Sequence, residues 1–295
     1  MSLFDMYNSE PERAVRVHYA PEIDPTKKFR IAVCYSGQPR HWRTALTNNL
    51  KFFGWTKHPV LGLDVEVDYF IHTWDTNTWR QPKQGHDNFV LEKHTDAEDI
   101  RTAYNPKGFV CEEFHQEKFT RAWDPMFYSH ARSLMMKRDY ELKNNFQYDL
   151  VIKARLDTVY DPIHMFPLAH VWPMVCYTCT PISKFPNEFN YNNFDDVLFY
   201  GDSPTMDLVG DIYDRNKQRH TPELVEKADN GPNLDVTMWY GPGCSLYEHC
   251  TDLGIHPEGV RVIEYAVVRS TAVNENLDGI NDYQKIRQKW FDWYI

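Results

Sequence analysis

Short apolar runs alternate with helical patterns from Phe29 to Arg269, and this alternation restricts the folds that the chain can adopt. The first run, 30–36, ends at Gly37 and Pro39, and a pattern of apolar residues at helical spacing follows it. The predicted strands are 30–36, 65–74, 108–114, 148–161, 172–179, 196–201 and 260–269, and the predicted helices are 40–54, 96–104, 124–146, 203–216 and 244–255. Because helices connect the strands, the sequence predicts an α/β fold with a mostly parallel central sheet flanked by helices.

The 295 residues are enough for one large α/β domain or two smaller ones. Residues 1–28 are polar, contain three prolines and show no sustained period, which predicts an extended N-terminal arm. Residues 276–295 combine aromatic and basic side chains and predict a C-terminal helix. Such a helix usually docks on its own domain, and the alternative is peripheral contact with a membrane surface.

The overall charge excludes some classes of partner. Asp and Glu number 42 against 32 Lys and Arg, a net charge of −10, so a broad basic surface for nucleic acid is not expected. A local basic pocket for a small anionic ligand is compatible with this charge. No apolar stretch approaches the ~20 residues of a membrane helix, and the N-terminus lacks the apolar core of a signal peptide. The expected location is therefore cytoplasmic.

The six cysteines are scattered, and several lie inside apolar runs, as is typical of core cysteines in a reducing compartment. Cys176 and Cys179 form a C-x-x-C, which a structural zinc site would complete with a second pair. Cys244 and Cys250 have the wrong spacing for that pair. The sequence therefore predicts core cysteines.

The stretch 148–161, YDLVIKARLDTVYD, begins as a buried strand and continues with Lys153, Arg155 and Asp157 at alternate positions. In a continuous strand these three side chains share one face. Such a row is costly inside a protein unless the charges pair or meet a charged ligand. Arg155 and Asp157 can satisfy each other, but this pairing leaves Lys153 without a partner. The row therefore favours a functional site, in which Asp157 holds a divalent cation or a ribose hydroxyl and Arg155 binds a phosphate.

Ligands of parallel sheets bind beyond the carboxyl ends of the strands, so the residues after each apolar run are candidates. Ser36 and Gly37 allow a close approach to the backbone, and Arg40 can bind a phosphate bidentately. A plain strand-to-helix turn with a surface arginine explains the same pattern. His72 and Trp74 end the second run, and we interpret His72 as a packed, hydrogen-bonded histidine rather than a catalyst.

Asp195 and Asp196 precede the apolar residues of the predicted strand 196–201. One aspartate can cap a turn, and the second favours a position that faces a cleft. A carboxylate there can act as a general base or bind sugar hydroxyls. The chain contains no G-x-x-x-x-G-K-[ST] sequence, which argues against a P-loop ATPase, and no H-E-x-x-H sequence.

In their order and spacing, these segments resemble a family of bacterial and phage glycosyltransferases of the GT-A type. The resemblance covers roughly residues 30 to 270. It rests on S-G-Q-x-R at 36–40, D-x-F-x-H-T-W at 68–74, Tyr128-Ser129 at the start of the long helix, Y-D-x-V-I-x-x-R-x-D at 148–157, and an aspartate before the apolar strand 196–201.

The resemblance implies a single GT-A-like catalytic domain over 29–275, with a nucleotide-sugar-binding half at 29–160 and an acceptor half at 161–275. It implies a donor site made of Ser36, Gly37, Arg40, His72, Trp74, Ser129, Lys153, Arg155 and Asp157. Asp196, with Asp195, becomes the candidate catalytic base. Relatives hold Mn²⁺ or Mg²⁺ with a D-x-D sequence, whereas here Asp157 is followed by Asp161 at a wider spacing. Either Asp157 binds a metal, or a metal-free enzyme uses lysine and arginine.

The expected activity is transfer of a sugar from a nucleoside diphosphate sugar to a hydroxyl of a glycan or lipid-linked acceptor. One alternative is a non-catalytic glycan-binding protein, for which 9 Trp, 18 Tyr and 17 Phe could supply stacking surfaces. Another is a different nucleotide-dependent transferase on a similar fold, because fold does not determine chemistry.

Overall fold

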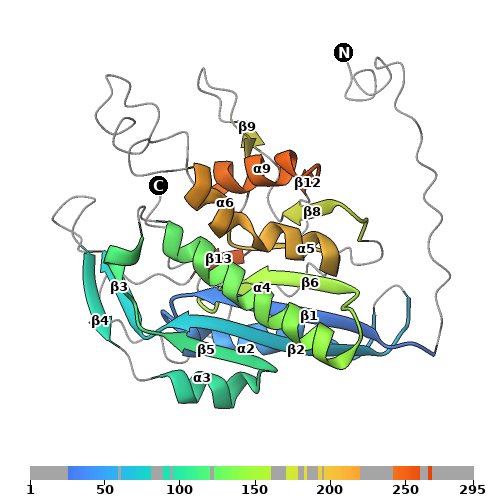
Figure 1. Ribbon diagram of the computed structural model, residues 1–295. Coiled ribbons are helices and arrows are strands. Elements are labelled where there is room, and N and C mark those ends of the chain that lie inside the picture. Colours follow the sequence, from blue (N-terminus) through green and yellow to red (C-terminus); the bar gives the residue numbers. More distant parts are fainter. Residues whose placement is uncertain are drawn as a thin grey trace.

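The computed structural model describes residues 26–58, 61–80, 89–93, 96–119, 123–160, 171–178, 183–184, 192–194, 196–219, 242–259 and 265–267. These residues form an α/β structure in which helices cover both faces of a seven-stranded sheet (Figure 1). The sheet contains β1 (Phe29–Gly37), β2 (Val65–Trp74), β5 (Gly108–Glu112), β6 (Leu150–Ala154), β8 (Val175–Thr178), β11 (Phe199–Gly201) and β12 (His256–Gly259). Three two-stranded sheets pair β3 (Thr76–Arg80) with β4 (Phe89–Lys93), β7 (Thr158–Tyr160) with β13 (Tyr265–Val267), and β9 (Ser183–Lys184) with β10 (Asn192–Asn193).

The strand order in the large sheet is β12-β8-β11-β6-β1-β2-β5. The pairs β1–β2, β1–β6, β2–β5 and β12–β8 are parallel, which confirms the predicted, mostly parallel sheet. β11 is antiparallel to both neighbours, which the sequence did not predict. From β1 the chain builds the sheet outward through β2 and β5, and then returns to place β6 on the other side of β1. The direction of strand addition therefore reverses between β1 and β6.

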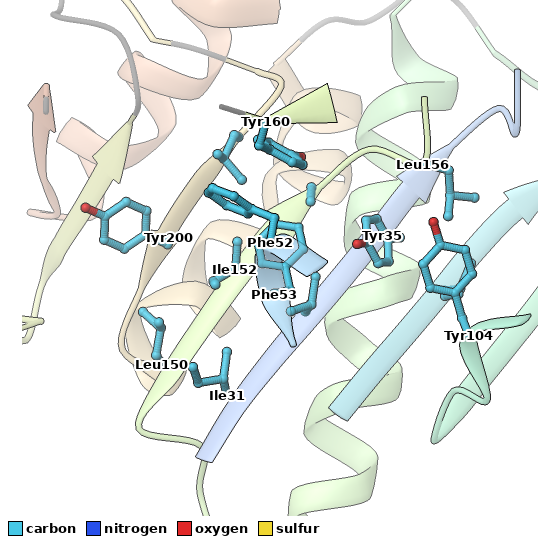
Figure 2. Packing of buried hydrophobic residues seen from close by; sticks show 14 of the residues in the cluster. Ile31, Tyr35, Phe52, Phe53, Tyr104, Leu150, Ile152, Leu156, Tyr160 and Tyr200 are labelled. Carbon is cyan, nitrogen blue, oxygen red and sulfur yellow. The ribbon is translucent and has the colours of Figure 1, made fainter. Parts of the chain in front are cut away.

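Both faces of β1 are buried, as expected for a central parallel strand. Ile31, Val33 and Tyr35 pack on the face covered by α2 (Trp42–Phe53) and α3 (Ala97–Tyr104), and Figure 2 shows part of this cluster. Ala32 and Cys34 pack on the opposite face. That face is covered by α4 (Asp124–Asn144), α5 (Ser203–Gly210), α6 (Ile212–Arg219) and α9 (Pro242–Asp252).

Four of the five predicted helices form with ends displaced by a few residues, whereas the predicted helix 203–216 is divided at Asp211 into α5 and α6. α4 begins at Asp124, as predicted, and Trp123 occupies the cap position. Pro125 lies in the first turn, where it needs no hydrogen-bonded N–H. Asn145 follows the helix with a φ of 54°, the left-handed conformation that commonly ends helices. α4 therefore ends at Asn144 rather than 146.

The prediction of one strand over 148–161 is wrong, because β6 ends at Ala154 and β7 begins at Thr158. Arg155, Leu156 and Asp157 lie in the turn between them. β7 leaves the large sheet and pairs with β13. The charged row is therefore divided: Lys153 stays on the central strand, and the other two charged residues follow its end.

Cys34, Cys176 and Cys250 are buried, as predicted for core cysteines, whereas Cys111 is only partly buried. Residues 1–25 of the expected arm, about half of the expected acceptor half 161–275, and the expected C-terminal helix 276–295 lie outside the described residues. Among the helices that the structure does describe, none has both the length and the apolar character needed to cross a lipid bilayer.

Candidate functional site

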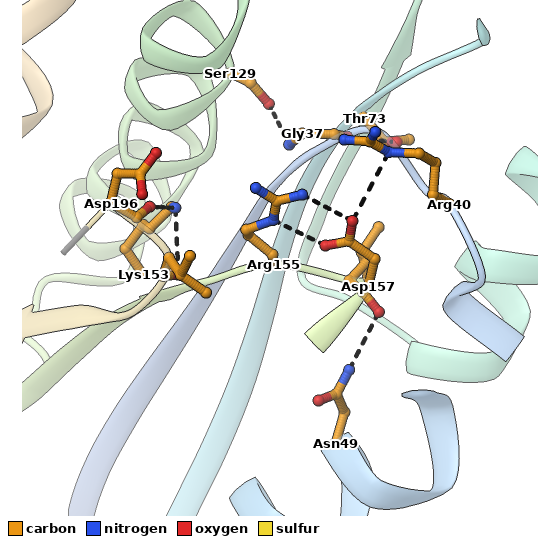
Figure 3. Close-up of polar contacts among 11 residues, drawn as sticks. Gly37, Arg40, Asn49, Thr73, Ser129, Lys153, Arg155, Asp157 and Asp196 are labelled. Carbon is orange, nitrogen blue, oxygen red and sulfur yellow. Dashed lines mark hydrogen bonds and ion pairs between the residues drawn. The ribbon is translucent and has the colours of Figure 1, made fainter. Parts of the chain in front are cut away.

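The predicted site residues gather where β1 and β6 end. Gly37 ends β1 and Arg40 follows it, and Arg155 and Asp157 follow β6 (Figure 3). These two neighbouring strands are the pair between which strand addition reverses. In open α/β sheets, ligands bind beyond the carboxyl ends of the strands at this kind of position.

Arg155 and Asp157 form a bidentate ion pair. Arg155 donates from Nε and Nη2 to the two carboxylate oxygens of Asp157, at 2.8 and 2.7 Å. Arg40 Nε lies 3.8 Å from Asp157 Oδ2. Burial alone would lower the pKa of Arg155, but the charge and hydrogen bonds of Asp157 outweigh burial and raise it. Asp157 is fully buried and is thus held between two guanidinium groups.

Lys153 does not lack a partner, and the sequence argument that assumed so is wrong. Its Nζ donates to the main-chain carbonyls of Asp196 and Val197 (Figure 3). These partners approach because the antiparallel strand β11 places Phe199 opposite Lys153. The ammonium group is fully buried and also lies 5.4 Å from the centre of the Phe199 ring. Lys153 therefore holds the segment that carries Asp196.

Asp196 is the candidate base that the structure describes, whereas Asp195 lies outside the described residues. The Asp196 side chain is partly exposed at the same edge of the sheet. Its charge is one of the influences that raise the pKa of Arg155, so the two groups interact. A carboxylate thus lies within electrostatic reach of Arg155, the arginine that follows β6.

Both main-chain polar groups of Gly37, at the end of β1, are hydrogen-bonded to side chains of other elements. The Gly37 N–H donates to Ser129 Oγ at 2.7 Å, and the Gly37 carbonyl accepts from Thr73 Oγ1 at 2.9 Å. Gly37 has a φ of 109°, a conformation that side chains disfavour. Its N–H is engaged with Ser129, so contact with a ligand at this turn falls to Arg40. The buried Ser36 hydroxyl has no hydrogen-bond partner in the structure.

His72 is a packed, hydrogen-bonded histidine, as predicted. Its Nδ1 lies 2.8 Å from Ser129 Oγ and its Nε2 lies 3.5 Å from Glu112 Oε1. Burial lowers the pKa of His72 to about 4, although Glu112 opposes this effect. Trp74 is also buried, and it stacks on Tyr128 with ring centres 5.5 Å apart. His72 and Trp74 therefore support the edge of the sheet from inside.

Sequence reasoning missed Glu112 and His130. Glu112 ends β5 and accepts hydrogen bonds from Tyr128 and Arg132, so the strand-end rule could have identified it. His130 lies in the interior of α4 next to Ser129, and nothing in the local sequence distinguishes it from an ordinary helix residue.

The described residues do not fit a divalent cation. Both oxygens of Asp157 accept from Arg155, and Arg40 is close by, so a cation there would meet two positive charges. Within the described ranges, no group of three or more His, Cys, Asp or Glu side chains is arranged to hold a metal ion. The prediction of Mn²⁺ or Mg²⁺ at Asp157 thus has no support from this geometry.

The chain matches no protein-family model, and no curated protein is significantly similar to it in sequence.

Proposed function

We propose that this chain is a glycosyltransferase of the GT-A-like kind, which transfers a sugar from a nucleoside diphosphate sugar to an acceptor hydroxyl. The observation that carries the proposal is the position of Arg40 and Arg155. They follow adjacent parallel strands at the reversal point of the sheet. An anionic ligand is expected at such a point, and arginine suits diphosphate recognition.

Among the described residues, the cluster holds Arg40, Lys153 and Arg155 against Asp157 and Asp196. With these groups in their ordinary charge states, the cluster has a charge of about +1 by formal count, in a chain of net charge −10. Arg155 Nη1 takes no part in the pair with Asp157. This excess charge, held in a partly buried place, would stabilise the negative charge that develops on a leaving diphosphate.

Asp196 would deprotonate the acceptor hydroxyl if transfer inverts the sugar. Lys153 would position Asp196 through the main chain and not by touching the donor. Ser36, Gly37, His72, Trp74 and Ser129 would shape the donor site. The acceptor would be a glycan or a lipid-linked molecule, and peripheral membrane contact through 276–295 stays a prediction, as does a cytoplasmic location.

The glycan-binding alternative receives less support from the described residues. Its basis was the large number of aromatic side chains, but many of these form the two buried clusters on either side of the sheet. Of the large hydrophobic side chains that are well exposed in the described ranges, Trp172 alone is aromatic. Another nucleotide-dependent transferase remains an alternative that product analysis separates, because its donor would transfer a group other than a sugar.

The test is a thermal-shift screen of the full chain with UDP, GDP, CMP, dTDP and ATP, each with and without Mn²⁺. A ligand at 100 times its dissociation constant stabilises a protein by about 2.7 kcal/mol, which such a screen detects. We expect one nucleoside diphosphate to raise the melting temperature without requiring Mn²⁺. Failure of every nucleotide to do so would refute the proposal.

Two variants and a control connect the shift to the site. Arg40→Gln and Asp157→Asn should each abolish the nucleotide shift. Arg43→Gln removes an arginine from the surface of α2, where it pairs with Asp96 and Asp99, and should retain the shift. Mass spectrometry of the chain incubated with the matching nucleotide sugar and candidate acceptors then identifies the transferred group.

A further inference from the structure

Three side chains connect the end of β5 to the turn that contains Gly37. Glu112 ends β5, His72 lies near the end of β2, and Ser129 lies near the start of α4. His72 Nε2 lies 3.5 Å from Glu112 Oε1, and His72 Nδ1 lies 2.8 Å from Ser129 Oγ. Ser129 Oγ in turn accepts the Gly37 N–H at 2.7 Å (Figure 3). A continuous chain of polar contacts thus runs from Glu112 to Gly37.

The single ring hydrogen of neutral His72 can lie on either nitrogen. Nδ1 has a partner in both cases, because the Ser129 hydroxyl can donate to it or accept from it. Nε2 is buried and makes no hydrogen bond in the structure, and the Glu112 carboxylate lies 3.5 Å away. A bare Nε2 would place a lone pair beside this carboxylate, whereas an Nε2–H places its positive end there. The carboxylate therefore favours the ring with its hydrogen on Nε2.

The Glu112 carboxylate is ionised and has a lone pair for this hydrogen. Burial alone would raise the pKa of Glu112, but the hydrogen bonds from Tyr128 and Arg132 outweigh burial and lower it. Oε2 accepts from Tyr128 at 2.8 Å, and Oε1 accepts from Arg132 at 3.1 Å. Each carboxylate oxygen can accept two hydrogen bonds. Glu112 can thus hold Tyr128, Arg132 and the His72 ring at the same time.

The position of the His72 hydrogen determines what Ser129 offers to Gly37. When Nε2 carries the hydrogen, Nδ1 accepts from the Ser129 hydroxyl, and Oγ accepts only the Gly37 N–H. When Nδ1 carries it, Oγ accepts two N–H groups and its own hydrogen must turn to the His72 carbonyl, 3.2 Å away. In the first form the hydrogen bonds of the chain all point the same way, and such bonds strengthen one another. The first form therefore holds Gly37 more firmly.

We propose that Glu112 is a positioning residue for the donor site. It does not contact the donor but keeps the hydrogen of His72 on Nε2, and Ser129 then holds the turn that carries Arg40. This inference rests on the proposed function, because it takes Arg40 as a ligand of the donor diphosphate. It has two separable consequences: a defined hydrogen position on the His72 ring, and an affinity for nucleotide that depends on Glu112.

The hydrogen position is measured by NMR spectroscopy of the full chain, labelled with nitrogen-15 histidine, at about pH 8, where histidine is neutral. Proton–nitrogen correlations distinguish a protonated ring nitrogen from a bare one, and His72→Asn identifies the His72 signals among those of the 13 histidines. We expect a bare Nδ1 and a protonated Nε2 in the wild-type chain. Glu112→Met removes the acceptor and should shift the hydrogen to Nδ1. Glu113→Met is the control, because the Glu113 side chain is 67% exposed and lies beside His115.

The effect on the donor site is measured by isothermal titration calorimetry with UDP, GDP and dTDP. The Gly37 carbonyl also accepts from Thr73 Oγ1 at 2.9 Å, so the turn keeps a second anchor and the effect should be moderate. We expect Glu112→Met to raise the dissociation constant of the nucleotide that binds by roughly threefold to tenfold. Glu113→Met should leave it unchanged. Because Glu112 acts through His72, its replacement should have no further effect in a chain that carries His72→Asn.

Each outcome supports or overturns the inference. A protonated Nδ1 in the wild-type chain would overturn it, as would nucleotide binding that Glu112→Met leaves unchanged, and both results would leave the proposed function intact. An equal loss of affinity from Glu112→Met with and without His72→Asn would show that Glu112 does not act through His72. Absence of binding by all three nucleotides to the wild-type chain would overturn the proposed function and the inference with it. If Glu112→Met does not fold, the wild-type spectrum and Glu112→Gln, which stays polar but loses the charge, decide.

Discussion

Replacement of Asp157 by Asn removes the carboxylate on which the arrangement at the end of β6 depends. Asp157 is fully buried, and its two oxygens accept from Arg155 at 2.8 and 2.7 Å. Removing one member of a buried ion pair costs about 3–5 kcal/mol, since the other charge stays buried and unpaired. The Arg155 side chain is 14% exposed and the Arg40 side chain 23%, so water can solvate them in part. We therefore expect a loss near the lower end, about 3 kcal/mol.

The measurement is urea-induced unfolding followed by tryptophan fluorescence, for which the chain has 9 Trp. The midpoint should fall with little change in slope, because the surface exposed on unfolding hardly changes. In thermal unfolding the same loss corresponds to a fall of roughly 6–12 °C. Asp99→Asn is the control: its partner Arg43 is exposed, and we expect a change of less than about 1 kcal/mol.

The double variant Arg155→Met, Asp157→Leu distinguishes a structural pair from a binding site. Apolar residues of similar volume can replace a buried ion pair without loss of stability. We expect the double variant to recover most of the stability lost in Asp157→Asn but to remain unable to bind nucleotide. A loss below about 1 kcal/mol in Asp157→Asn, or nucleotide binding by the double variant, would refute this reasoning.

Three further predictions concern the edge of the sheet. Gly37→Ala should cost about 1–2 kcal/mol from backbone strain alone, because a β-carbon there meets no atom within 4 Å; urea unfolding measures it. Ser129→Ala should cost about 1–3 kcal/mol, because it leaves the Gly37 N–H without its acceptor, and Ser133→Ala serves as a comparison in the same assay. Because the pKa of His72 is about 4 in the folded protein, against 6.5 ordinarily, the unfolded chain binds more protons between these values. Stability should therefore fall by roughly 3 kcal/mol as pH drops from 6.5 to 4, and this part of the fall should disappear in His72→Asn, as pH-dependent urea titrations of both proteins would show.

The sheet could be predicted because its central strands are apolar on both faces and end at polar residues. The end of β6 at Ala154 could not be predicted from the sequence. Residues 153–158 continue a period of two, with Leu156 buried, so a strand and a turn give the same pattern. The choice between strand and turn is made by contacts with residues that are far away in the sequence. Asn48 exchanges hydrogen bonds with the main chain of Tyr160, and β13 pairs with β7.

The residues of the candidate site that directly follow the ends of strands could be predicted from the sequence. The rule that polar residues collect at the carboxyl edge brought together Arg40, Arg155 and Asp157. The partner of Lys153 could not be read from the sequence, because it consists of main-chain carbonyls on a segment 43 and 44 residues away. Every residue has a main-chain carbonyl, so the residue type does not indicate which carbonyl will be the acceptor. These carbonyls lie just before β11, which is antiparallel to β6 and was therefore not expected from a parallel sheet.

The two arginines of the candidate site have different surroundings, which predicts a different task for each. Arg155 is held by two short hydrogen bonds to Asp157, whereas Arg40 Nε lies 3.8 Å from the same carboxylate and its side chain is more exposed. A diphosphate would therefore compete more readily for Arg40 than for Arg155. Asp157 would keep Arg155 as its partner when Arg40 turns to the ligand.

Arg40→Gln should consequently lose nucleotide binding with a stability change of about 1 kcal/mol or less, as for a partly exposed ion pair. Arg155→Gln should lose about 3 kcal/mol of stability, because it leaves the buried carboxylate of Asp157 without the two hydrogen bonds from Arg155. Urea unfolding and the nucleotide thermal shift, measured on both variants, check the two expectations together. The opposite result, a large loss of stability in Arg40→Gln with binding intact, would show that Arg40 is the structural partner of Asp157 and that the ligand approaches Arg155 alone.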